Sequence, residues 1–124
     1  MLDLYCYQGE WSLHAARGGA ADVLGVDSSE AAVAAARRNL EANGLTGVGF
    51  RRGDVFEVAR ELERGSQRFG LVILDPPALI KSRRHLAAGT RAYRDLNRLA
   101  MSLLDEEGVL IRSEERRVGK ECRL

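Results

Sequence analysis

Short apolar runs alternate along this chain with stretches of helical spacing, and this alternation constrains the fold more than any other feature of the sequence. The apolar runs predict strands over residues 2–5, 23–26, 48–51, 71–74 and 109–111. The stretches between them predict helices over residues 11–17, 31–43, 55–64 and 90–104. Strands that alternate with helices form a parallel sheet with right-handed crossovers. The sequence therefore predicts a single α/β domain, for which its 124 residues are enough.

The fourth apolar run ends at an acidic residue followed by two prolines, Asp75, Pro76 and Pro77. Four apolar residues in succession are typical of a strand that is buried on both faces. Pro76 has a fixed φ and no N–H, so the strand cannot continue, and it pushes Asp75 toward an extended conformation. Because ligands of open α/β sheets bind outside the carboxyl ends of the strands, this stiff elbow would direct Asp75 toward a ligand. A strand that simply ends in a rigid turn is the other interpretation.

The composition is that of a soluble globular protein, with 45% hydrophobic and 30% charged residues. No apolar run approaches the roughly 20 residues that span a membrane, and Met1 and Leu2 lead directly into an acidic residue rather than a signal peptide. The two cysteines, Cys6 and Cys122, form neither a disulfide framework nor a metal-ligand spacing. We therefore expect a cytoplasmic protein with no membrane partner and no bound metal.

Positive charge is concentrated after the elbow. The basic segment comprises Lys81, Arg83, Arg84, Arg91, Arg94 and Arg98, with His85 among them and Asp95 as the only acid. Such a cluster beside a ligand site suits a polyanionic substrate. A solvated helix face with its adjoining loop is the alternative, and on the cluster alone it is the favoured one.

Polar residues follow each of the first four predicted strands. They are Tyr7 and Gly9 after the first strand, then Asp27, Asp54 and Asp75 after the next three. An acid at the end of the second strand can accept hydrogen bonds from both hydroxyls of a ribose, and Asp27 follows Gly9 at close to the expected spacing. Asp54, at the end of the third strand, can hold an exocyclic amine. Each acid alone is more often a helix cap, but together they predict a nucleoside site.

The first of these loops argues against a phosphate-bearing cofactor. Gly9 stands alone, whereas a dinucleotide fingerprint needs three glycines, and Glu10 and Trp11 are unsuitable neighbours for a pyrophosphate. The chain also has no Walker lysine motif. S-adenosylmethionine (SAM), a nucleoside cofactor without phosphate, fits the pattern better.

With these residues in view, the sequence resembles class I SAM-dependent methyltransferases. It is most similar to the bacterial 23S rRNA cytosine-5 methyltransferase family, whose members carry an N-terminal PUA domain, and the resemblance runs from residue 2 to about residue 111. The matching motifs are Leu2–Ser12 (motif I), Val26–Ser29 (ribose), Gly53–Phe56 (adenine), Asp75–Ser82 (motif IV) and Tyr93–Asn97 (the following helix).

The resemblance implies a Rossmann-like fold with five parallel strands in the order 3-2-1-4-5, from which the last two strands of the family fold are missing. It implies a cofactor site formed by Asp3, Tyr7, Gly9, Asp27, Ser28, Asp54, Val55 and Asp75. Asp75 and Pro76 would position the target base. Lys81, Arg83 and Arg84 would bind 23S rRNA.

The chemistry of the resembled family implies a cysteine thiolate that adds to C6 of cytosine and so makes C5 nucleophilic toward the SAM methyl group. That cysteine follows the fifth strand in a Ser/Thr-Cys-Ser segment, where this chain has Arg112, Ser113 and Glu114. Cys6 is expected in the core and Cys122 lies in a segment without apolar pattern. We therefore expect this chain to be inactive in the covalent step.

Other functions remain open at this point. An rRNA guanine-N2 methyltransferase shares the Asp-Pro-Pro elbow and needs no cysteine. A catalytically dead remnant that binds SAM, or does not fold, is a candidate of another class. An adenine-N6 methyltransferase is less favoured, because its elbow places an aromatic residue after the prolines and here Ala78 follows them.

Residues 112–124 break the alternating pattern. They hold five basic and three acidic residues and almost nothing to bury. The stretch 112–122 resembles the translation of a widely used sequencing adapter. Together with the abrupt start at Met1, this predicts a gene fragment with a partial methyltransferase domain over 1–111 and a disordered tail over 112–124. The PUA domain and the domain between it and this one would then be missing.

Overall fold

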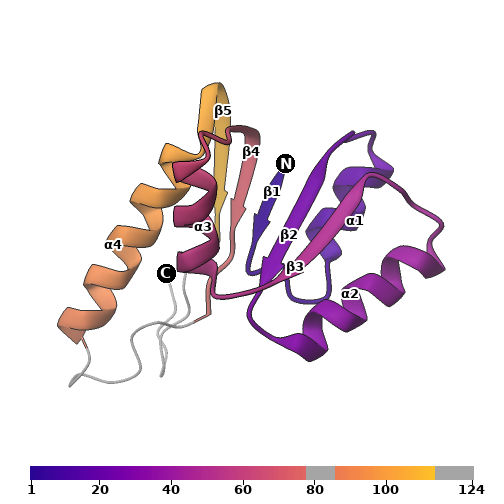
Figure 1. Cartoon of the computed structure of the whole chain (residues 1–124), viewed down its shortest axis with the longest axis horizontal. Coiled ribbons are helices and arrows are strands. Elements are labelled where there is room, and N and C mark those ends of the chain that lie inside the picture. The colour runs from indigo at the N-terminus through magenta and orange to yellow at the C-terminus, as the bar shows by residue number, and fades with distance from the viewer. Residues whose placement is uncertain (78–85, 114–124) are drawn as a thin grey trace.

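A computed structural model describes residues 1–77 and 86–113 of the chain. Its five strands are all parallel and form one sheet in the order β3-β2-β1-β4-β5 (Figure 1). They are β1 (Leu2–Leu4), β2 (Val23–Asp27), β3 (Val48–Arg52), β4 (Phe69–Leu74) and β5 (Leu104–Arg112). The predicted fold class and strand order are therefore confirmed.

Helices cover both faces of the sheet, as the right-handed crossovers require (Figure 1). They are α1 (Glu10–Arg17), α2 (Glu30–Ala42), α3 (Val55–Arg64) and α4 (Leu86–Ser102). α1 and α2 lie on one face, and α3 and α4 lie together on the other. Each predicted helix is present, and α3 has the predicted bounds.

Several predicted boundaries were wrong. β1 ends at Leu4 because Tyr5 adopts a left-handed φ of 64°, which no strand can continue. α4 already includes Leu86, since the alanines before Thr90 favour helix and need no cap there. β5 runs from Leu104 to Arg112 rather than over 109–111, because Leu104 also pairs with Phe69 and the register shift between the Phe69 and Leu71 pairings lies inside the strand.

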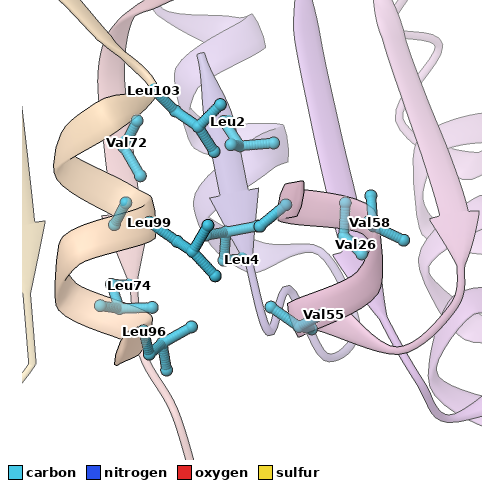
Figure 2. Close-up of a cluster of buried hydrophobic side chains, with 12 residues drawn as sticks. Leu2, Leu4, Val26, Val55, Val58, Val72, Leu74, Leu96, Leu99 and Leu103 are labelled. Carbon is cyan, nitrogen blue, oxygen red and sulfur yellow. The ribbon is translucent and has the colours of Figure 1, made fainter. Parts of the chain in front are cut away.

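The main core lies between the sheet and the layer formed by α3 and α4. Side chains from the three central strands meet those of the two helices there, and all are buried (Figure 2). The labelled members are Leu2, Leu4, Val26, Val55, Val58, Val72, Leu74, Leu96, Leu99 and Leu103. Leu2 and Leu4 point into this layer, so by the alternation of a strand Asp3 between them faces the layer that contains α1.

A smaller core lies under α2 and comprises Cys6, Val33, Ala36 and Phe50. Cys6 is buried as predicted, although it follows β1 by two residues instead of lying within it. The Phe50 ring fills space beside two glycines: a Cβ on Gly25 would lie 2.7 Å from Cδ1 of this ring, and a Cβ on Gly9 2.8 Å from Cζ. This close packing sets the position of the loop that follows β1.

β5 forms one edge of the described sheet. Val109 and Ile111 are 55% and 42% exposed, while Leu110 between them packs against the main core. Arg112, predicted to begin the tail, is the last residue of this strand. The predictions for Lys81, Arg83, Arg84 and Cys122 lie outside the described residues.

Candidate functional site

Three carboxylates gather where β1, β2 and β4 end. Asp3 pairs with Gly25 on one neighbouring strand and with Ile73 on the other. Asp27 and Asp75 each follow those partners by two residues, so strand alternation puts them near Asp3 on the α1 side of the sheet. Both raise the pKa of Asp3, which is consistent with this proximity. The register therefore brings together three acids that are far apart in the sequence.

Asp27 ties the loop after β1 to the start of α2. Its Oδ2 accepts a hydrogen bond from the Tyr7 N–H and its Oδ1 accepts one from the Ser29 N–H, both at 2.9 Å. A carboxylate oxygen has lone pairs for a second donor, so Asp27 can still accept hydroxyls of a ligand. The side chain is only half-buried. Asp27 thus has a structural role and retains acceptor capacity at the position where a binding role is predicted.

The loop between β1 and α1 has an unusual backbone. Tyr5, Tyr7 and Gly9 have φ values of 64°, 51° and 86°, all in the left-handed region. Such conformations cost free energy in residues other than glycine and persist only where surrounding contacts hold them. Those contacts include Asp27 on Tyr7 and the Asn39 amide, which donates to the Gln8 carbonyl at 3.1 Å. These contacts stabilise the left-handed backbone of the loop.

Asp54 and Ser29 cap helices, in keeping with the alternative reading of strand-end polar residues. Asp54 Oδ1 accepts from the Phe56 N–H at 2.9 Å at the start of α3. Ser29 Oγ accepts a hydrogen bond from the Ala32 N–H at 3.1 Å and so caps the start of α2. Ser28 is exposed and does not cap this helix. Asp54 is itself exposed, so capping and ligand binding are compatible in it.

A pocket of about 550 Å³ opens at the ends of β2 and β3. Its lining consists of Tyr5, Ser28, Arg52, Gly53, Asp54, Val55 and Phe56. The predicted site residues Ser28, Asp54 and Val55 are all among them. Apolar and aromatic walls beside a carboxylate and a hydroxyl suit a planar, hydrogen-bonding heterocycle.

The pocket also contains residues that sequence reasoning missed. Tyr5 was assigned to a strand, and only its left-handed backbone turns it into the pocket wall. Burial, followed by the charges of Asp54 and Asp27, raises the pKa of Tyr5 to about 12, so its hydroxyl stays protonated. Phe56 was placed in the adenine motif but not among the site residues, and Arg52 was missed because an arginine at a strand end carries no distinctive signal.

Asp3 is the most perturbed acid of the site. Both Asp3 and Ser12 are fully buried, and Ser12 Oγ donates to Asp3 Oδ2 at 2.7 Å. Oδ1 of Asp3 has no partner, and it is the one buried side-chain oxygen or nitrogen of the described residues in that situation. Burial raises the pKa of Asp3 to about 6, against the hydrogen bonds from Ser12 and with a smaller contribution from Asp75 and Asp27.

The elbow after β4 has the predicted outward carboxylate. Asp75 is exposed, and its Oδ1 accepts from Ser113 Oγ at 2.6 Å, which links the elbow to the end of β5. The Tyr93 hydroxyl donates to the Pro77 carbonyl at 3.2 Å and links it to α4. Contacts from two other elements thus support the elbow.

The basic segment is described only in part. Arg91, Arg94 and Arg98 are exposed on α4, and Arg98 forms an ion pair of 3.4 Å with Asp95. An exposed pair of this kind contributes little to stability. Their exposure is compatible with both interpretations of the basic segment, a nucleic-acid surface and a solvated helix face.

Cys6 is not a reactive thiol. Burial is the main cause that raises its pKa to about 12, and the charges of Asp3 and Asp27 add to the effect. Since the thiolate is the nucleophile, Cys6 is inert near neutral pH.

Neither a metal centre nor a membrane span was found in the part of the chain that the structure describes. No group of three or more His, Cys, Asp or Glu residues there could hold a metal ion, and this includes the carboxylates of Asp3, Asp27 and Asp75. No helix there is long and apolar enough to cross a bilayer.

Comparison with known proteins adds to this geometry. The sequence profile of a family described as "Methyltransferase domain" matches residues 1–123. The chain belongs to this methyltransferase domain family. The sheet order described above is thus that of a member of this family.

Among similar proteins, "Ribosomal RNA large subunit methyltransferase I" of Photobacterium profundum is 41% identical over 113 residues, and that of Aeromonas hydrophila is 40% identical over the same length. The matches cover 90% of this chain but only 28% of each relative. This methyltransferase domain therefore corresponds to less than a third of those proteins.

Solved structures share the fold. The protein SMU.776, crystallised in complex with SAH, superimposes with a TM-score of 0.77 at 27% identity, over 90% of this chain and 30% of that one. A SAM-dependent methyltransferase from Agrobacterium tumefaciens gives a TM-score of 0.74 at 22% identity, over 96% of this chain and 39% of that one. The second likeness is one of fold alone.

Proposed function

We propose that the chain is the cofactor-binding part of a SAM-dependent methyltransferase that acts on 23S rRNA in the cytoplasm. The single observation that carries this is the convergence of Asp3, Asp27 and Asp75 at the strand ends of a methyltransferase domain, next to a pocket that Asp54 lines. The similarity to rRNA large subunit methyltransferases supports the choice of substrate.

The residues at the strand ends fit SAM. Asp27 would accept the ribose hydroxyls with its spare lone pairs, and Asp54 with Val55 and Ser28 would hold the adenine in the 550 Å³ pocket. The unpartnered Asp3 Oδ1 is an acceptor for an ammonium group. When bound, SAM supplies an electrophilic methyl group.

The loop after β1 would carry the methionine end of the cofactor. Tyr7 and Gly9 lie in the part of this loop that Asp27 and Phe50 hold in place. A side chain on Gly9 would collide with the Phe50 ring, so this backbone can come close to a ligand only as glycine.

The elbow would receive the target base. Asp75 is exposed beside Asp3 and Asp27, so it borders both the cofactor and the substrate side, and Pro76 fixes the backbone on which a flipped base would rest. Lys81, Arg83 and Arg84 would bind the RNA phosphates next to it.

We propose C5 of cytosine as the target of the parent activity, on the resemblance of the motifs. A guanine amine is the second candidate, and the state of Cys6 favours it: this buried thiol cannot supply the thiolate that C5 chemistry needs. Methylation at an amine requires a carboxylate or carbonyl at the elbow but no cysteine.

The chain by itself would not methylate cytosine. Its two cysteines are the inert Cys6 and Cys122, and Cys122 stands in a stretch without an apolar pattern to anchor it. A nucleophile displaced by about 1 Å can lose on the order of a hundredfold in rate. A catalytically dead SAM-binding protein is thus the third candidate.

Two assays separate these candidates. Calorimetry of the 124-residue chain with SAM and with SAH tests cofactor binding, and absence of binding to both would overturn the proposal. Methyl transfer from labelled SAM to unmodified 23S rRNA, followed by nucleoside analysis, then identifies the base. Label on cytosine C5 would contradict the expected inactivity, label on a guanine amine would establish the second candidate, and binding without label would leave the SAM-binding protein.

A further inference from the structure

The buried pair Asp3 and Ser12 is more than a packing contact between β1 and α1. The hydroxyl donates to one carboxylate oxygen at 2.7 Å, while the other oxygen has no partner although both residues are fully buried. An unsatisfied buried acceptor is unfavourable, and native structures retain few of them. A contact that served packing alone would be expected to satisfy both oxygens or to use apolar side chains.

No positive charge compensates this carboxylate. The neighbouring strands present Asp27 and Asp75, which are both acidic, and the nearby Cys6 thiol is neutral. On α1 the chargeable side chains are Glu10, His14 and Arg17, and none of them forms a hydrogen bond or ion pair with Asp3 in the described residues. Asp3 must therefore either take up a proton or receive a cationic ligand.

Ser12 favours the ionised form of the Asp3 carboxylate over the protonated form. A hydroxyl has one hydrogen, and Ser12 donates it to Oδ2, so the bond stabilises the charged form. The bond also fixes the rotation of the carboxylate, with Oδ1 buried and without a protein partner.

We propose that Ser12 is a positioning residue, which keeps Asp3 ionised and oriented with Oδ1 free to accept the ammonium group of SAM. This inference rests on the proposed function. It predicts that cofactor affinity falls with acid as Asp3 takes up a proton, and that Ser12 sets the pH at which this happens.

The test compares Ser12→Ala with the unchanged 124-residue chain by calorimetry with SAM between pH 5 and pH 8. The variant should raise the pH midpoint of Asp3 by about one unit, because it lacks the hydrogen bond from Ser12 that favours the charge. The loss of affinity relative to the unchanged chain should be about threefold at pH 6.5 and approach tenfold at pH 5. At pH 8 the two affinities should agree, because Asp3 is then ionised in both.

Two controls isolate the mechanism. Ser102→Ala removes another partly buried serine hydroxyl, which bonds the Leu99 carbonyl away from the site, and should leave the profile unchanged. Asp3→Asn removes the ionisation, so adding Ser12→Ala to it should produce no further pH dependence. Carbon-13 NMR of the Asp3 carboxyl in the ligand-free chain measures the midpoint without any cofactor.

The outcomes are distinct. If the unchanged chain binds neither SAM nor SAH, the proposed function fails. If the unchanged chain binds SAM and Ser12→Ala has the same midpoint and affinities, Ser12 is only a packing residue and the inference fails. A variant that merely unfolds is recognised by circular dichroism, and the comparison of Asp3→Asn with the unchanged chain then decides: an unaltered pH profile refutes the role of Asp3, and a flattened one supports it.

Discussion

Asp27→Ala should reduce both the stability of the strand-end loops and the affinity for SAM. The carboxylate accepts two backbone N–H bonds at 2.9 Å, one from Tyr7 and one from Ser29. A hydrogen bond to a charged group contributes about 1.5–3 kcal/mol. Because Asp27 is half-buried and water can replace part of the loss, we expect a decrease of roughly 2–3 kcal/mol in the free energy of unfolding.

The effect on binding has a separate origin. The proposed bonds from Asp27 to the ribose hydroxyls would be lost as well, which corresponds to at least a tenfold weaker SAM affinity. Urea denaturation measures the first effect, and calorimetry at a temperature where the variant remains folded measures the second. Asp27→Asn keeps the shape of the side chain and an acceptor oxygen. Its stability and its SAM affinity should therefore lie between those of Asp27→Ala and those of the unchanged chain.

Asp105→Ala is the matched control. Asp105 Oδ1 accepts the N–H of the residue two positions later, Glu107, as Asp27 does with Ser29, but it lies at the amino end of the sheet. Asp105→Ala should lower the free energy of unfolding without changing the SAM affinity. Equal SAM affinity in folded Asp27→Ala and in the unchanged chain would refute the assignment of Asp27 to the cofactor site.

Four further outcomes follow from the same contacts. Leu99→Ala should lower the free energy of unfolding in urea by about 2–5 kcal/mol, because Leu99 lies within the main core; a change below 1 kcal/mol would contradict its burial. Asp3 has a higher pKa folded than unfolded, so the free energy of unfolding falls as the pH rises from its ordinary pKa of 3.8 through about 6, and Asp3→Asn should stabilise the chain more at pH 7.5 than at pH 4.5; an equal effect at both pH values would contradict the raised pKa of Asp3. In a Cys122→Ser background, Cys6 should resist iodoacetamide at pH 7.5 until urea unfolds the chain, and rapid labelling of the native chain would disprove its burial. Replacing Lys81, Arg83 and Arg84 by glutamine should flatten the salt dependence of RNA binding, whereas replacing Arg60, Arg64 and Arg68 should not; equal slopes would mean that the first three do not contact phosphate.

Local patterns in the sequence were sufficient to predict the architecture. Apolar runs and helical spacing depend on nearby residues, and their alternation allows only a parallel sheet with crossovers. The prolines after Asp75 end a strand wherever they occur, so the outward carboxylate could also be predicted. Asp27 and Asp54 were found because strand ends in such a sheet lie together.

Only the tertiary structure decided how these residues work. Tyr5 was predicted to continue a strand, but the packing of its loop turns it into a pocket wall. Ser12 was matched to motif I but given no role, since its partner Asp3 lies nine residues away on another element. The length of β5 depended on pairing between Phe69 and Leu104. Each of these features comes from contacts between distant parts of the chain, whose free energy overrides the local preference of the residue and cannot be read from its neighbours in the sequence.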